Sequence, residues 1–251
     1  MAQKTSGTIV IVGASSGIGE ALAMRLAHEA RPVAVLARRE DRLADLCDRI
    51  RDKVGTGRAQ AFAHDVLDTE SVAACWDRIE SELEPIDEVF YCSGVMPEVG
   101  MDEFPTDKDE QMLRVNALGC MAWGNEAARR FLKLGRGHFT GVSSVAGIRG
   151  RLDRPGYNAS KAAQDTYLEA LRNRLWRHGI RVTTVRPGPV KTEMTADLGK
   201  LPLLIDADRC AKGIVKARSR SAAIAYTPFL WRPIMNVIQA IPSFIFRKLN
   251  V

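Results

Sequence analysis

A glycine-rich stretch early in the sequence has the composition of a phosphate-binding turn. Residues 12–19 read VGASSGIG, which places Gly13, Gly17 and Gly19 between an apolar run and a predicted helix. Glycine permits a tight turn and close backbone approach, and a helix N-terminus presents unpaired N–H groups and a positive dipole to an anion. The stretch therefore indicates a dinucleotide site, although a glycine-rich turn alone is also common without a ligand.

A second set of reactive side chains lies further along the chain. The sequence YNASK puts Tyr157 and Lys161 on one face of a predicted helix, and Ser144, thirteen residues before Tyr157, ends a predicted strand together with Ser143. A phenol, with a pKa of about 10, can exchange protons near neutral pH when positive charge stabilises its anion. Lys161 supplies such charge, and Pro155 as first helical residue puts Tyr157 in the opening turn. We expect the assembled site to lower the pKa of Tyr157.

Strand-like runs alternate with helical patterns and would bring these motifs together. The predicted strands lie at 8–13, 32–37, 59–65, 87–94, 137–144, 180–188 and 222–226, and the predicted helices at 17–30, 40–54, 69–83, 107–134, 155–178 and 206–218. Nearly continuous apolar runs fit strands covered on both faces, and the alternation predicts a parallel sheet with right-handed crossovers. We expect one doubly wound α/β domain over residues 1–226, with a seven-stranded parallel sheet between helical layers.

These motifs together resemble the short-chain dehydrogenase/reductase family. RVNALG (114–119) and RPGPVKT (186–192) add to the match, and the motifs follow the family's order and spacing across nearly the whole chain. The resemblance implies a Rossmann-type fold. It also implies reversible hydride transfer between a nicotinamide cofactor and a carbonyl or alcohol carbon.

The resemblance assigns a role to each reactive residue. Tyr157 would be the general acid/base, and Ser144 would donate a hydrogen bond to the substrate oxygen. Lys161 would bind the cofactor ribose and tune Tyr157, and Asn116 would belong to a proton relay. From its residue type alone, Asn116 could instead bond to local backbone. Ser144 is preferred to Ser143 because its separation from Tyr157 matches the family pattern.

The resemblance also implies a set of cofactor-binding residues. Thr192 would hold the nicotinamide carboxamide together with the backbone near Val190, and Asp65 would face the adenine, although an Asp that begins a turn is common anyway. The expected set is Gly13, Ser15, Ser16, Gly17, Ile18, Gly19, Arg38, Arg39, Asp65, Val66, Ser93, Gly94, Tyr157, Lys161, Pro187, Gly188, Val190 and Thr192.

The end of the second predicted strand favours NADP(H) over NAD(H). A carboxylate for the ribose 2′-hydroxyl is typical there in NAD enzymes, whereas this chain reads LARRE, with Arg38 and Arg39. Arginine suits a 2′-phosphate, and Arg38 is preferred as its direct contact. Both could instead be solvated residues at a helix start.

Two positions depart from the family pattern. Val12 stands where the family commonly has Thr, and Tyr91, Cys92, Ser93 and Gly94 replace a common Asn-Asn-Ala-Gly stretch. Losing a hydroxyl would leave a polar partner unsatisfied unless that partner had also changed. We therefore expect altered anchoring between strands with the cofactor site retained. Cys92 is read as a buried small apolar residue, with a reactive thiol as the alternative.

The segment that covers the substrate in this family is apolar here. Residues 193–218 form the predicted lid, and they indicate a hydrophobic or lipid-linked carbonyl compound, although core packing explains some of the leucines equally well. The expected lid side chains are Met194, Leu198, Leu201, Leu203 and Leu204.

Residues 227–251 form an apolar and basic C-terminal extension. Arg232, Arg247 and Lys248 flank an uncharged run, 233–246, that is too short to cross a bilayer but could lie in its interface. Folding back over the pocket and forming a subunit contact are the alternatives. RPGPVKTEMTADL with AIPSFIFRKL is locally similar to decaprenylphosphoryl-2-keto-ribose reductases, which makes a polyprenyl-phosphoryl ketosugar one candidate substrate.

Composition narrows the remaining classes. The formal net charge is +6, but Lys and Arg are scattered among nearly as many Asp and Glu, so no nucleic-acid partner is expected. The dispersed histidines give no metal site, and GVSSV is not a hydrolase nucleophile elbow. Five separated cysteines indicate free thiols in the cytoplasm, with the protein soluble or peripheral at the inner membrane face.

The leading hypothesis is an NADPH-dependent carbonyl reductase or alcohol dehydrogenase, expected to be a homodimer or homotetramer. A non-catalytic dinucleotide-binding regulator or redox sensor would need the glycine turn but not Ser144, Tyr157 and Lys161. A membrane-associated scaffold would use the extension and would leave the same three residues unexplained.

Overall fold

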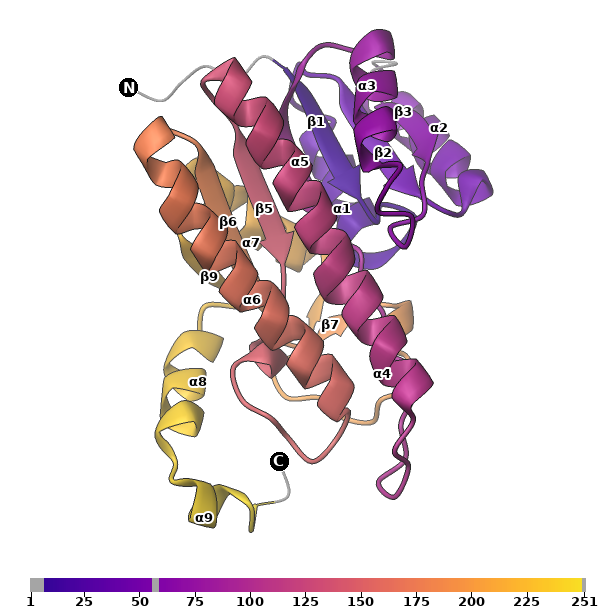
Figure 1. The fold of residues 1–251 in the computed structure, drawn as a ribbon. Helices are drawn as coiled ribbons and strands as arrows, with labels where there is room; N and C mark the ends of the chain where they lie inside the picture. Colours follow the sequence, from indigo (N-terminus) through magenta and orange to yellow (C-terminus); the bar gives the residue numbers. More distant parts are fainter. Residues whose placement is uncertain (1–6, 56–58, 250–251) are drawn as a thin grey trace.

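A computed structural model describes residues 7–55 and 59–249. The first six residues of the predicted domain and the last two of the predicted extension lie outside the described residues. The described part contains a seven-stranded parallel sheet in the order β3-β2-β1-β4-β5-β6-β9 (Figure 1). The strands are β1 (Thr8–Val12), β2 (Val33–Ala37), β3 (Ala59–Ala63), β4 (Ile86–Tyr91), β5 (His138–Val142), β6 (Arg181–Pro187) and β9 (Ile224–Thr227). The predicted doubly wound α/β fold is confirmed.

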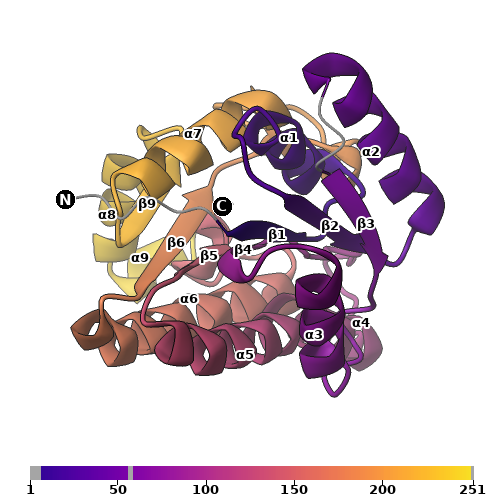
Figure 2. The ribbon, with the colours of Figure 1, turned by 90° about the horizontal axis from the view of Figure 1, so that it is seen from above.

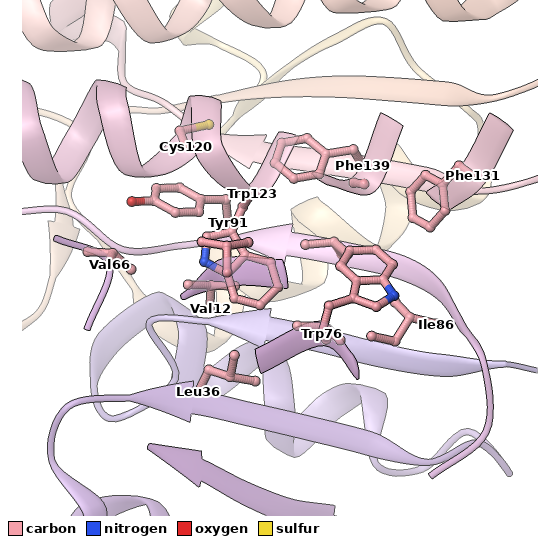
Figure 3. Packing of buried hydrophobic residues seen from close by; sticks show 14 of the residues in the cluster. Val12, Leu36, Val66, Trp76, Ile86, Tyr91, Cys120, Trp123, Phe131 and Phe139 are labelled. Atoms are coloured by element: carbon pink, nitrogen blue, oxygen red, sulfur yellow. The ribbon is translucent and has the colours of Figure 1, made fainter. Parts of the chain in front are cut away.

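Helices cover both faces of the sheet (Figure 2). One layer contains α1 (Gly17–Leu26), α2 (Glu40–Val54) and α7 (Ala207–Ser219), and the other contains α3 (Val72–Glu82), α5 (Gly119–Leu134) and α6 (Pro155–Leu175). The strands present apolar side chains on both faces, so a helical layer can pack on each face of the sheet. On the second face, Trp76 of α3 and Trp123 and Phe131 of α5 form the aromatic part of the core (Figure 3).

The chain departs from the predicted helices in two places. The predicted helix 107–134 is divided into α4 (Thr106–Met112), a π-helical segment (Leu113–Leu118) and α5. Such local widening is frequent at functional sites, and this one contains Asn116. A small second sheet, β7 (Val190–Lys191) with β8 (Ile205–Asp206), was not predicted; it closes the base of the expected lid.

The C-terminal extension is helical in its described part. It contains α8 (Trp231–Ala240) and α9 (Ser243–Phe246), and Trp231 and Met235 pack on Val145. Arg149 donates to the carbonyls of Ile238 and Ile241, both at 2.6 Å. Of the helices within 7–55 and 59–249, none combines the length and hydropathy that a bilayer crossing requires.

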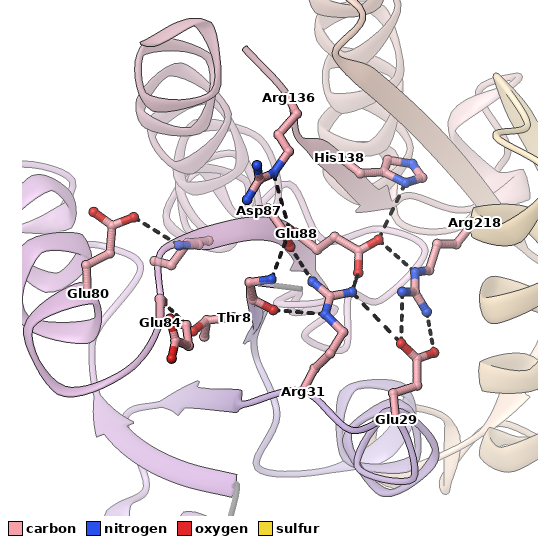
Figure 4. Close-up of polar contacts among 12 residues, drawn as sticks. Thr8, Glu29, Arg31, Glu80, Glu84, Asp87, Glu88, Arg136, His138 and Arg218 are labelled. Atoms are coloured by element: carbon pink, nitrogen blue, oxygen red, sulfur yellow. Dashed lines mark hydrogen bonds and ion pairs between the residues drawn. The ribbon is translucent and has the colours of Figure 1, made fainter. Parts of the chain in front are cut away.

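Buried charges join the strands at their amino ends (Figure 4). Glu88 of β4 is 2% exposed and forms ion pairs with Arg31 and with Arg218, whose Nε lies 2.7 Å from its carboxylate. Nδ1 of His138 is 3.8 Å from the same carboxylate. Burial lowers the pKa of His138 to about 4, so the ring is neutral at pH 7. This network lies at the sheet edge opposite the motifs singled out in the sequence.

Candidate active site

Two adjoining hollows lie beyond the carboxyl ends of the strands, where doubly wound sheets bind ligands. We call them the glycine-turn hollow and the tyrosine hollow; Ile18, Thr192 and Met194 line both. The predicted residues that line the first are Gly13, Ser15, Ser16, Gly17, Ile18, Gly19, Arg38, Arg39, Val66, Ser93, Gly94 and Thr192. Those that line the second are Ile18, Ser144, Tyr157, Pro187, Gly188, Val190 and Thr192.

The glycine turn has the backbone that its sequence predicts. Gly13 and Gly17 have φ of +89° and +60°, values that a side chain disfavours, and a Cβ on Gly19 would lie 2.2 Å from the carbonyl oxygen of Gly13. Ser16 is the N-cap of α1 but makes no side-chain capping bond, so it leaves the first-turn N–H groups to a ligand. The turn therefore fits a pyrophosphate at the helix N-terminus.

Tyr157 and Ser144 meet in the tyrosine hollow. Pro155 begins α6, so Tyr157 lies in the opening turn as expected. Ser144 follows β5, and its Oγ accepts a hydrogen bond from the Ala146 N–H at 3.1 Å. Burial raises the pKa of Tyr157, while a hydrogen bond with Ser144 and the charges of Arg154 and Arg151 lower it; the expected lowering concerns the site assembled with its cofactor and stays a prediction. In this structure desolvation outweighs the nearby positive charge.

Lys161 lies behind Tyr157. Its ammonium is 5.9 Å from the Tyr157 ring centroid and donates to the Val142 carbonyl at 3.1 Å and to Gln164 Oε1 at 3.0 Å. Burial lowers the pKa of Lys161 to about 8, so its amine is protonated in most molecules at pH 7. A Cβ on Gly94 would lie 3.3 Å from Asn116 Oδ1, a tight contact, and 3.6 Å from Lys161 Nζ, an ordinary van der Waals distance.

Asn116 is buried and fully hydrogen-bonded. Its Oδ1 accepts from the Val95 N–H at 2.8 Å, and its Nδ2 donates to the Val95 carbonyl at 3.0 Å and to Ser160 Oγ at 2.9 Å. These partners are distant in sequence, so the alternative of local backbone bonding is wrong. The side chain ties the segment after β4 to α6. Ser143, which was not preferred as the donor to the substrate oxygen, donates to the Lys161 carbonyl at 3.3 Å and contacts the same helix.

Most of the chain matches one protein family. A family model described as short chain dehydrogenase matches residues 7–201. The chain belongs to the short-chain dehydrogenase/reductase family. It is therefore an oxidoreductase of the type that uses a nicotinamide dinucleotide.

Similar proteins cover nearly the whole of this short-chain dehydrogenase. An uncharacterised oxidoreductase of Mycobacterium tuberculosis is 29% identical over 242 residues, 96% of each chain. Another from Myxococcus xanthus is 33% identical over 228 residues, covering 86% of this chain and 87% of its own. A short-chain dehydrogenase from Sphingobium yanoikuyae in complex with NADPH superimposes with a TM-score of 0.81 at 24% identity, over 94% of this chain and 97% of the other.

The two arginines expected at the adenosine end of this dehydrogenase occupy different surroundings. Arg39 donates from Nη2 to Ser15 Oγ and Ser16 Oγ, each at 2.9 Å, and so lies on the glycine turn. Arg38 is exposed, with Nη1 3.9 Å from Asp65. Asp65 does not line either hollow in the described residues; its carboxylate accepts from the Leu67 N–H at 3.0 Å, the local turn role weighed as its alternative.

Two of the positions that depart from the family pattern, Val12 and Tyr91, pack together. Val12 and Tyr91 are opposite each other in the β1–β4 pair and share one core cluster. The Tyr91 hydroxyl donates to the Val115 carbonyl at 2.5 Å, in the π-helical segment. Anchoring through backbone pairing and apolar contact agrees with the expectation. Burial raises the pKa of Cys92 to about 12, which opposes the reactive-thiol alternative.

Sequence reasoning missed part of the tyrosine hollow and misplaced part of its lid. Met194, Leu198 and Leu201 line the hollow, but Leu203 and Leu204 do not and are exposed. Residues without a sequence signal also line it. They come from the loop after β4, the segment before α6 and the extension, among other places, and include Met96, Arg151, Arg154 and Trp231. His64, set aside as a dispersed histidine, lines the glycine-turn hollow and accepts from Trp123 Nε1 at 3.2 Å.

Proposed function

We propose that the chain is an NADPH-dependent carbonyl reductase or alcohol dehydrogenase that acts on an apolar or lipid-linked ketone or secondary alcohol. The observation that carries this proposal is the placement of Tyr157 and Ser144 in one hollow, next to a glycine turn whose helix N-terminus opens toward a second, adjoining hollow. When bound, the nicotinamide supplies or accepts a hydride at the substrate carbon. Turnover of NADPH with a panel of apolar ketones, monitored at the absorbance of the reduced cofactor, tests the proposal.

The chain's own residues would handle the oxygen and the proton. In the reducing direction, Ser144 donates a hydrogen bond to the carbonyl oxygen and Tyr157 transfers its phenolic proton to that oxygen, giving the alcohol. The ammonium of Lys161 stabilises the phenolate left behind, and Asn116 holds the segments through which a proton relay would reprotonate it. In the oxidising direction the same groups act in reverse.

Arg38 and Arg39 support NADP(H) as the cofactor, with Arg38 expected to contact the 2′-phosphate. We expect Arg38→Ala to lower the ratio of kcat/KM with NADPH to kcat/KM with NADH roughly 10–100-fold, since a hydrogen-bonded charge pair to phosphate is lost. Steady-state kinetics with both cofactors measure this ratio. Arg51→Ala, which removes an exposed arginine on α2, is the matched control. An unaltered ratio in Arg38→Ala would contradict Arg38 as the contact to the 2′-phosphate.

The polyprenyl-phosphoryl ketosugar stays a candidate within this substrate class. The apolar side chains of Met194, Leu198 and Leu201 support an apolar body near the reacting carbon. Local similarity of the extension to ketoribose reductases is the reason to include such a compound in the ketone panel.

We also propose that the extension contacts anionic membrane lipid. Val237 and Phe244 are 66% and 62% exposed, and the exposed Arg247 and Lys248 lie three and four residues after Phe244. Phe244→Ser with Val237→Ser is expected to abolish flotation with phosphatidylglycerol vesicles, because each buried side chain contributes about 1.5–3 kcal/mol and each basic residue about 1 kcal/mol. Leu132→Ser on α5 is the control. Flotation equal to that of the unsubstituted protein in the double variant would contradict this contact.

The remaining proposals concern the location of the protein, its oligomeric state and the non-catalytic alternative. The five described cysteines are free, which supports a reducing, cytoplasmic location, and association into a homodimer or homotetramer stays a proposal that light scattering measures. The non-catalytic regulator is disfavoured by the joint placement of Ser144 and Tyr157, which dinucleotide binding alone does not require.

A further inference from the structure

Arg151 carries a positive charge in the wall of the tyrosine hollow, where the negative charge of Asp153, which lines the same hollow, acts on it from beyond ion-pair distance. Within residues 7–55 and 59–249, no carboxylate lies at ion-pair distance from its guanidinium, and its hydrogen-bond contact is the weak acceptor Met235 Sδ at 3.8 Å from Nη2. Its Nε is buried and has no acceptor. Burial lowers the pKa of Arg151, which reflects the cost of holding this charge away from water.

Two further donors face the same hollow with unused capacity. Arg154, three residues on, has a buried Nε without an acceptor, although its Nη1 pairs with Asp153 at 2.9 Å. Trp231 Nε1 is also buried without an acceptor in the described structure. Asp153 thus forms an ion pair with Arg154, whereas it acts on Arg151 only from a longer distance. Arg151 is partly buried, and its buried Nε lacks an acceptor. An unused donor that faces a hollow is typical of a site that a ligand completes.

We infer that Arg151 binds an anionic group, a phosphate or a carboxylate, carried by the carbonyl substrate. This inference rests on the proposed function, because it places the anion in the hollow that contains Tyr157. Leu198 and Leu201 give that hollow an apolar wall. The substrate is then an anionic amphiphile, with its charge at Arg151, its apolar body on the lid and its carbonyl oxygen at Tyr157.

The test compares matched ketones that differ only in charge. One keto acid is assayed as the free carboxylate and as its methyl ester, and a keto-alkyl phosphate of equal chain length forms the third arm. In Arg151→Gln, the ratio of kcat/KM for the anion to kcat/KM for the ester is expected to fall about 10–100-fold, mainly through KM. Arg151→Lys should restore part of the ratio. Whichever anion, the carboxylate or the phosphate, loses more kcat/KM in Arg151→Gln is the group that Arg151 binds.

Exposed Arg177, beyond the far end of α6, provides the control variant Arg177→Gln, which should keep the ratio of the unsubstituted protein. An equal ratio in Arg151→Gln and the unsubstituted protein would overturn the anion site. Calorimetric titration of the protein with an alkyl phosphate and an alkyl carboxylate, with and without NADPH, reads anion binding independently of turnover. Binding that depends on Arg151 without reduction of any ketone would sink the proposed function alone; reduction without preference for the anion would sink this inference alone.

Discussion

Tyr157→Phe is expected to lower kcat for ketone reduction about 10²–10⁴-fold, the usual contribution of a positioned general acid. The substitution removes one hydroxyl from the tyrosine hollow and leaves the glycine turn, Arg38 and Arg39 in place. Binding of NADPH, followed by the fluorescence of the reduced cofactor, should therefore persist. Single-turnover kinetics at saturating NADPH measure the loss at the chemical step.

A second tyrosine on the same helix provides the matched control. The Tyr167 hydroxyl contacts the Met121 carbonyl at 3.1 Å and Asn125 Oδ1 at 3.0 Å, outside both hollows. Tyr167→Phe removes an equivalent group from α6 and should keep turnover within about threefold of the unsubstituted protein, since a net hydrogen bond is worth only about 1 kcal/mol. Full activity in Tyr157→Phe would refute the proposed chemistry.

The second large effect concerns stability. Glu88→Ala is expected to lower the free energy of unfolding by about 3–5 kcal/mol, because it leaves the buried guanidinium groups of Arg31 and Arg218 short of one carboxylate. For a chain of this length each kcal/mol corresponds to roughly 2–4 °C in Tm, so a drop of about 6–20 °C should appear in a thermal scan.

The exposed pair Glu110–Arg114 gives the comparison. Its carboxylate and guanidinium are 3.4 Å apart on the helix surface, and Glu110→Ala should cost only about 0.3–0.5 kcal/mol. Urea titration of both variants at pH 7 measures the difference. If Glu88→Ala unfolded at the same urea concentration as Glu110→Ala, the buried network would contribute nothing beyond a surface pair.

Local patterns were sufficient to predict the fold and many of the residues that line the two hollows. Seven apolar runs gave seven parallel strands, because a strand covered on both faces has few polar residues and is easily recognised. Gly13 and Gly17 were informative because their positive φ values need glycine. Tyr157 was placed by Pro155, which begins α6.

Other features depend on contacts that no short pattern encodes. Arg151 resembles any loop arginine until α8 places Met235 and Trp231 beside it, more than seventy residues later. The desolvation that raises the pKa of Tyr157 in this structure was not foreseen, because the extent of burial depends on the whole fold. The break between α4 and α5 was missed because the helical pattern continues across the π-helical segment.

Trp231 has a consequence for how this enzyme could diverge. The matched family region ends at residue 201, yet α8, from beyond that point, supplies part of the wall facing Tyr157. Descendants can therefore exchange the end of the chain and alter part of this wall without changing Tyr157. One part of the hollow can then evolve in a stretch of the gene separate from the one that encodes Tyr157.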